Sequence, residues 1–98
     1  MRMTHHAWWR WQQRHPHLDL RRELAAARRP SKRLNQLLAV SSLRVPKEER
    51  LPRRYLITDN DVVFVLGVED VIITVMRLSE AKRRARRLRR EMKRRASG

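Results

Sequence analysis

The sequence predicts an α+β domain in which N-terminal helices pack on a three-stranded antiparallel meander and a basic helix follows at the C-terminus. Three observations favour this class. Apolar residues recur at helical spacing within residues 1–40, β-branched residues and turn signals alternate over 54–78, and arginines surround a narrow apolar stripe over 79–96. A chain of 98 residues, 41% of them hydrophobic, is expected to fold as the single domain 1–98 around a small core.

Three short helices are predicted within residues 1–40. Each follows a residue whose side chain suits the N-cap position, in order Thr4, Asp19 and Ser31. The first helix is expected to end at His15, because Pro16 disfavours the helical conformation in the residue before it. The second is expected to stop near Pro30, and residues 41–53, which contain two prolines, are expected to form a loop.

The centre of the chain predicts a meander with strands at about 54–59, 61–67 and 71–77. Strand-favouring residues are dense there, and two segments supply turn signals: Asp59-Asn60-Asp61 and Gly67-Val68-Glu69-Asp70. With turns at these places, Phe64 faces Ile57 on one side and Ile73 on the other. The predicted core face is Tyr55, Ile57, Val62, Phe64, Val71, Ile73 and Val75. A one-residue slip in either turn would exchange the two faces of a strand.

A long basic helix is predicted over 79–96. Its apolar residues form one narrow stripe: Ala81, Ala85, Leu88 and Met92. Ser79 is expected to act as its N-cap, with Glu80 in the first turn. Residues 79–98 contain 10 basic and 2 acidic residues, and this density of like charge opposes the helix unless a polyanion offsets the repulsion.

A formal net charge of +15 is the strongest indication of function. Arginine accounts for 21 of the 25 basic residues, a surplus that attracts polyanions such as nucleic acid or an acidic protein. Codon usage in a GC-rich genome would also enrich arginine. The chain has no cysteine, which excludes disulfides and thiolate zinc sites. It also has no apolar run near the ~18 residues of a membrane span, and its basic helix has a stripe of mostly alanine, so a cytoplasmic protein that binds no membrane is expected.

The segment MTHHAWWRWQQRHPH, residues 3–17, concentrates histidine, tryptophan and arginine. No two of its histidines lie four residues apart on one helix, so neither a metal site nor a cofactor is predicted. Trp8 and Trp11 lie on the same side of a helix as Ala7, which favours a place in the core. Trp9 points elsewhere and is the candidate for stacking on an unpaired base.

His6, Arg10 and Arg14 recur every four residues and therefore form one polar stripe along the first helix. This combination suits RNA cleavage without a metal, in which the 2′-hydroxyl attacks the adjacent phosphate. An imidazole can move the proton near neutral pH, and guanidinium groups can stabilise the charge that grows on the phosphate. A solvated helix face would give the same pattern, so the stripe alone leaves both interpretations open.

The segment THHAWWRWQQR resembles the T-x-H-A-x-x-R-x-x-x-R opening of a set of small prokaryotic and phage proteins with the RelE-like, barnase–colicin type of toxin ribonuclease fold. The matching residues are Thr4, His6, Ala7, Arg10 and Arg14, and the strand segment closes in a similar way on Thr74-Val75. The resemblance covers residues 4–14 and 54–78. It implies helices on one face of a twisted antiparallel sheet, the other face open to RNA, and metal-independent ribonuclease activity that an antitoxin often neutralises.

The leading hypothesis is an RNA-directed protein, specifically a small metal-independent RelE-like ribonuclease. His6 would be the acid–base group, with Arg10 and Arg14 as the phosphate clamp. Thr74 would place a hydroxyl on the same wall. Residues expected to hold RNA are Trp9, Arg77, Lys82, Arg83, Arg86, Arg87, Arg90 and Arg94. The alternative is a non-catalytic phage or accessory protein that binds RNA, a ribonucleoprotein such as the ribosome, or a transcription complex through its basic surfaces. An acidic antitoxin is the protein partner expected of the ribonuclease.

Overall fold

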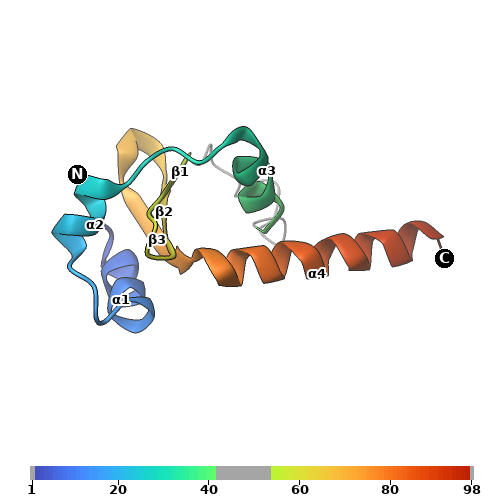
Figure 1. The fold of residues 1–98 in the computed structure, drawn as a ribbon, viewed down its shortest axis with the longest axis horizontal. Coiled ribbons are helices and arrows are strands. Elements are labelled where there is room, and N and C mark those ends of the chain that lie inside the picture. The colour runs from blue at the N-terminus through green and yellow to red at the C-terminus, as the bar shows by residue number, and fades with distance from the viewer. Residues whose placement is uncertain (1, 42–53, 98) are drawn as a thin grey trace.

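The computed structural model describes residues 2–41 and 54–97, in which four α-helices and a three-stranded antiparallel sheet follow one another along the chain (Figure 1). The helices are α1 (His5–Arg14), α2 (Leu20–Ala26), α3 (Lys32–Ser41) and α4 (Leu78–Ser97), and the strands are β1 (Arg54–Ile57), β2 (Val62–Leu66) and β3 (Ile72–Arg77). The 3₁₀ turn η2 (Val68–Asp70) connects β2 to β3. The predicted α+β class, with its meander and basic C-terminal helix, is confirmed.

The predicted N-caps of the first three helices are confirmed. In each, the capping side-chain oxygen accepts a hydrogen bond from the backbone N–H three residues further on. The distances are 3.1 Å for Thr4, 3.3 Å for Asp19 and 3.2 Å for Ser31. Each bond satisfies one backbone donor that has no partner inside the helix. Local sequence signals therefore set where these helices begin.

The second helix ends earlier than predicted, at Ala26 rather than near Pro30. The segment that follows is bound to the sheet, because Arg28 and Ile57 exchange two backbone hydrogen bonds of 2.9 and 2.8 Å. This bridge covers part of the β1 edge. The loop predicted at 41–53 begins one residue too early, since Ser41 belongs to α3, and the rest of it, 42–53, lies outside the described residues.

The strand positions are confirmed, but the predicted pairing is wrong. Phe64 pairs with Leu56 on β1 and with Val75 on β3. The predicted partner on β1, Ile57, pairs with Val63 instead. The core face predicted from sequence therefore mixes residues from the two faces of the sheet.

Both turns explain this difference. The first has three residues rather than two, because the Thr58 N–H donates to the Val62 carbonyl at 3.1 Å and Asp61 adopts a left-handed φ of 68°. On the other side of β2, the pairing shifts between Val65 and Leu66, and a β-bulge absorbs one extra residue of β3. The bulge buries Ile72 almost completely and leaves its neighbour Ile73, the predicted core residue, half-buried.

Helices cover both faces of the sheet (Figure 1). One face packs against α1 and partly buried leucines of α2, through Val62, Phe64, Leu66, Ile72 and Val75. The other packs against Leu38 of α3 and Ala81 of α4, through Tyr55, Ile57, Val63 and Val65. All five residues of β2 are buried, as expected for an apolar run with neighbours on both sides. The open face implied by the family resemblance is therefore absent from the described part of the chain.

The buried face of α1 is narrower than predicted. Trp11 is 4% exposed and its ring stacks on Phe64, with ring centroids 5.9 Å apart. Ala7 and His15, four residues before and after Trp11, are buried with it. Trp8 lies about 100° around the helix from Ala7 and is 44% exposed, so its predicted place in the core is wrong.

The basic helix α4 begins at Leu78, and its cap comes from another part of the chain. The Asp61 carboxylate accepts hydrogen bonds from the Ser79 N–H at 2.8 Å and from the Ser79 hydroxyl at 2.7 Å. The Asp61 carbonyl also accepts from the Leu78 N–H at 2.9 Å. The prediction of Ser79 as the N-cap is wrong, because the β1–β2 turn already satisfies these donors.

The predicted apolar stripe of α4 is buried only over its first part. Ala81, Ala85 and Leu88 are buried, whereas Met92 is 54% exposed. The C-terminal part of α4 extends away from the sheet (Figure 1).

Candidate nucleic-acid interface

The first helix lies alongside β3 and points towards α4. At its start, the Thr4 N–H donates to the Ile72 carbonyl at 2.9 Å. At its end, His15 Nε2 lies 3.2 Å from the Met76 carbonyl oxygen. The polar stripe predicted on α1 therefore leads towards the beginning of α4.

Arg14 and Arg77 meet at that junction around one carboxylate. A guanidinium nitrogen of each lies 3.5 Å from Glu80 Oε1, and Arg77 Nε donates to the Arg14 carbonyl at 3.1 Å. The side chains are partly exposed, 32% for Arg14, 43% for Arg77 and 22% for Glu80. Two guanidinium groups against one carboxylate leave a net positive charge at the surface.

The sequence predicted both arginines as site residues but missed Glu80. The spacing of three residues is a signal for the pair of Arg77 and Glu80, because Arg77 immediately precedes α4 and Glu80 lies in the first turn of that helix. Nothing local links either residue to Arg14, which is 66 residues away from Glu80 in the chain.

His6 and Arg10 both contact Trp9 on the outer side of α1. The ring centroids of His6 and Trp9 lie 6.3 Å apart, and Arg10 Cζ lies 5.4 Å from the Trp9 centroid. Trp9 is 50% exposed and Trp8 is 44% exposed, so two indole rings face solvent on one helix. The prediction that Trp9 lies at the surface is confirmed.

The four predicted catalytic residues do not converge on one point. His6 and Arg14 are two helical turns apart, about 12 Å along the helix axis. Thr74 pairs with Val65, whose side chain packs under α3 and α4, so Thr74 belongs to the face of the sheet that α1 does not cover. The predicted placement of Thr74 on the same wall as His6 is wrong, because His6 lies on α1, which packs against the opposite face of the sheet.

The predicted RNA-binding residues of α4 lie on more than one side of the helix. Arg83 and Arg87 line a shallow groove of about 370 Å³ together with Glu80 and Arg84, the last of which the sequence did not single out. Lys82 is half-buried and lies on the opposite flank of α4 from Arg84. Other predicted residues on the same helix are exposed: Arg86, Arg90 and Arg94.

Most of the α4 arginines are electrostatically uncompensated. Within the described ranges 2–41 and 54–97, no ion pair involves Arg83, Arg84, Arg86, Arg87 or Arg90. Neighbouring guanidinium groups at spacings of three and four residues repel one another on a helix. A bound polyanion would relieve that repulsion.

Three further findings bear on the function. The described residues contain no group of three or more histidine or acidic side chains that could hold a metal ion. No helix among those residues has the length and apolar character needed to cross a membrane. Comparisons with family models, curated proteins and solved structures give no match to this chain.

Proposed function

We propose that the protein binds single-stranded RNA along a continuous surface, the basic strip, which consists of Arg10, Arg14, Arg77, Arg83, Arg84 and Arg87. The observation that carries this proposal is the meeting of Arg14 and Arg77 at Glu80, because it joins the stripe of α1 to the groove of α4. The stripe on α1 alone would present only two arginines, Arg10 and Arg14.

Arginine is well suited to this role. Its planar guanidinium can donate two parallel hydrogen bonds to a phosphate and remains charged at every physiological pH. Contacts of this kind are independent of base sequence and release condensed counterions, so affinity falls as salt rises. The net charge of +15 would also accelerate encounter with a polyanion.

The two exposed tryptophans favour a single strand over a duplex. Unpaired bases stack on aromatic side chains, whereas the bases of a duplex are already stacked on one another. Trp9 lies beside Arg10 at the start of the basic strip, so a strand that follows the strip would bring a base within reach of its ring.

RNA cleavage is a second candidate function, favoured by the contacts that His6 and Arg10 both make with the Trp9 ring. A base stacked on Trp9 would place its own phosphodiester near an imidazole and a guanidinium. His6 would then accept the 2′-hydroxyl proton as the 2′-oxygen attacks the phosphorus. The bond from phosphorus to the 5′-oxygen would break, that oxygen would take a proton from water, and Arg10 would stabilise the charge on the phosphate. Arg14 is engaged with Glu80 and Thr74 lies on the other face, so this chemistry would rest on two residues. An acidic antitoxin in the cytoplasm, or the acidic surface of a transcription complex, would compete with RNA for the same strip.

Binding is tested by fluorescence anisotropy with a labelled single-stranded RNA, the same sequence as DNA, and the RNA duplex, all at near-physiological salt. The proposal predicts that the RNA single strand binds more tightly than its duplex. Equal binding of all three would identify a general polyanion binder, and tighter binding of the duplex would contradict the proposal. Incubation of the same single strand with EDTA, followed by gel analysis, tests metal-independent cleavage.

A further inference from the structure

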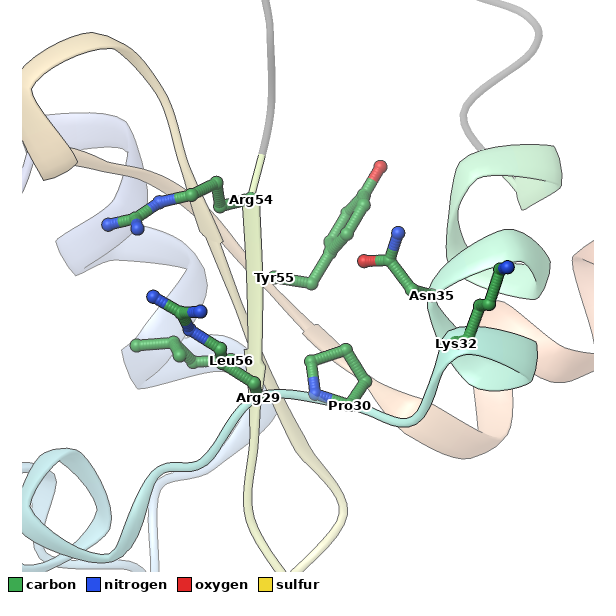
Figure 2. Close-up of a pocket in the computed structure, with 7 residues that line it drawn as sticks. All are labelled: Arg29, Pro30, Lys32, Asn35, Arg54, Tyr55 and Leu56. Atoms are coloured by element: carbon green, nitrogen blue, oxygen red, sulfur yellow. The ribbon is translucent and has the colours of Figure 1, made fainter.

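A hollow of about 560 Å³ lies at the β1 edge of the sheet, within the range of small-molecule sites (Figure 2). The segment between α2 and α3 forms its lower side. Arg28 ties that segment to Ile57, and Pro30, which has no backbone N–H, cannot extend the pairing along β1. The chain therefore leaves the strand at Pro30 and enters α3, and the hollow opens between them. The lining residues are Arg29, Pro30, Lys32, Asn35, Arg54, Tyr55 and Leu56.

This hollow is separate from the basic strip. The sheet order is β1-β2-β3, so β1 and β3 are its two edges. The strip follows β3 through Arg77, whereas the hollow opens at β1.

The charge of the lining favours an anion. Of the seven lining residues within the described part of the chain, three are cationic and none is acidic. Within the described part of the chain, Arg29 and Lys32 form no ion pair, while Arg54 is paired with Asp70, which is not among the lining residues. Lys32 is also the first residue of α3, where the helix dipole adds partial positive charge.

The shape and the other side chains favour a planar group attached to that anion. Figure 2 shows the guanidinium groups of Arg29 and Arg54 on one side of β1, and the Tyr55 ring on the other, facing the amide of Asn35. The Pro30 ring lies on the same side of β1 as the Tyr55 ring and below it. Asn35 is exposed, and its amide can both donate and accept a hydrogen bond, as the edge of a nucleobase requires.

From these observations we infer that the hollow binds a nucleoside 5′-monophosphate, with the phosphate towards Arg29 and Arg54 and the base beside Tyr55 and Asn35. The same chemical unit occurs free in solution and at the 5′-phosphorylated end of an RNA chain. In either form it occupies a site that the basic strip does not include, so this inference stands independently of the proposed function.

The test is a titration of the full chain with 5′-AMP at near-physiological salt, followed by calorimetry and by backbone amide NMR shifts. Saturable binding is expected, with shifts concentrated at residues 29–35 and 54–56. Arg29→Gln and Asn35→Ala should each weaken AMP binding about tenfold, because each removes a direct polar contact. Their matched controls, Arg33→Gln and Gln36→Ala, change exposed neighbours on α3 that do not line the hollow, and should leave the affinity unchanged.

Two further arms identify the source of the ligand and the part played by its base. If the site binds the ends of RNA chains, a short RNA with a 5′-phosphate should displace AMP better than the same RNA with a 5′-hydroxyl. If the site binds only the free nucleotide, the two RNAs should displace AMP to the same extent. Inorganic phosphate should bind more weakly than AMP. The inference is overturned if AMP fails to bind, if phosphate alone binds as tightly, if shifts are confined to α4, or if Arg29→Gln and Asn35→Ala bind AMP as the wild type does.

Discussion

Arg77 at the end of β3 donates a hydrogen bond of 3.1 Å from its Nε to the backbone carbonyl of Arg14 at the end of α1. The same two side chains share one carboxylate oxygen of Glu80. This contact holds two guanidinium groups from distant parts of the sequence side by side at the base of the arginine-rich helix. The basic strip is continuous because of it.

Glu80 should restrain RNA binding, because its carboxylate occupies the guanidinium groups that a phosphate would need. Glu80→Gln is therefore expected to increase the affinity for single-stranded RNA roughly fivefold, the scale of one partly exposed charge pair. Anisotropy titrations measure the change. Glu91→Gln, which makes the same change in net charge further along α4, is the control. An equal gain in both variants would show that net charge alone matters.

Trp9 should contribute by stacking rather than by charge. Trp9→Ala is expected to weaken the binding of single-stranded RNA about tenfold, because base–aromatic stacking is worth about 1–3 kcal/mol per base. The salt dependence of binding should stay the same, since no phosphate contact is lost. Gln12→Ala, at an exposed position of the same helix, should have no effect. If Trp9→Ala flattens the salt dependence, the ring acts by positioning Arg10 and not by stacking.

His6 should separate cleavage from binding. If RNA is cleaved in EDTA, His6→Ala should lower the rate by roughly 10²–10⁴ while the RNA affinity stays near that of the wild type. His5→Ala is the internal control, because His5 is exposed and lies about 100° around the helix. Cleavage that continues at the full rate in His6→Ala would remove this residue from the mechanism. Absence of cleavage by the wild type would leave RNA binding as the function.

The β-bulge makes a distinct prediction about stability. Ile72 is 1% exposed and belongs to the core under α1, whereas Ile73 is half-buried. Ile72→Ala should therefore lower the free energy of unfolding by about 2–5 kcal/mol, and Ile73→Ala by clearly less. Chemical denaturation of the two variants measures the difference. The reverse order would mean that β3 pairs in the phase predicted from sequence.

Local signals were sufficient to predict most of the secondary structure. The caps at Thr4, Asp19 and Ser31 and the helix end before Pro16 depend on residues within one turn. The strand register did not follow from such signals. It depends on whether the first turn contains two or three residues and on the bulge opposite Leu66, and both are settled by how the whole sheet packs between helices.

The site was predicted in parts but not as an assembly. Spacing on one helix identified the stripe of His6, Arg10 and Arg14, and composition identified the basic tail. The contacts that join them are long-range, since Arg14 meets Glu80 across 66 positions and Asp61 caps a helix that begins at Leu78. Periodicity carries no information about such pairs. The hollow at β1 was missed for the same reason, because its lining comes from three separate elements.

The most direct test of the basic strip is the salt dependence of RNA binding in two double variants of equal charge. Arg84→Gln with Arg87→Gln removes two cations of the strip, and Arg21→Gln with Arg22→Gln removes two exposed cations of α2. For a single-stranded ligand, each lost phosphate contact should reduce the slope of log K against log salt by about 0.7. The strip variant should therefore bind more weakly with a slope reduced by about 1.4, while the α2 variant keeps the wild-type slope. Equal losses in both variants would contradict a defined strip and indicate that RNA responds only to the overall charge.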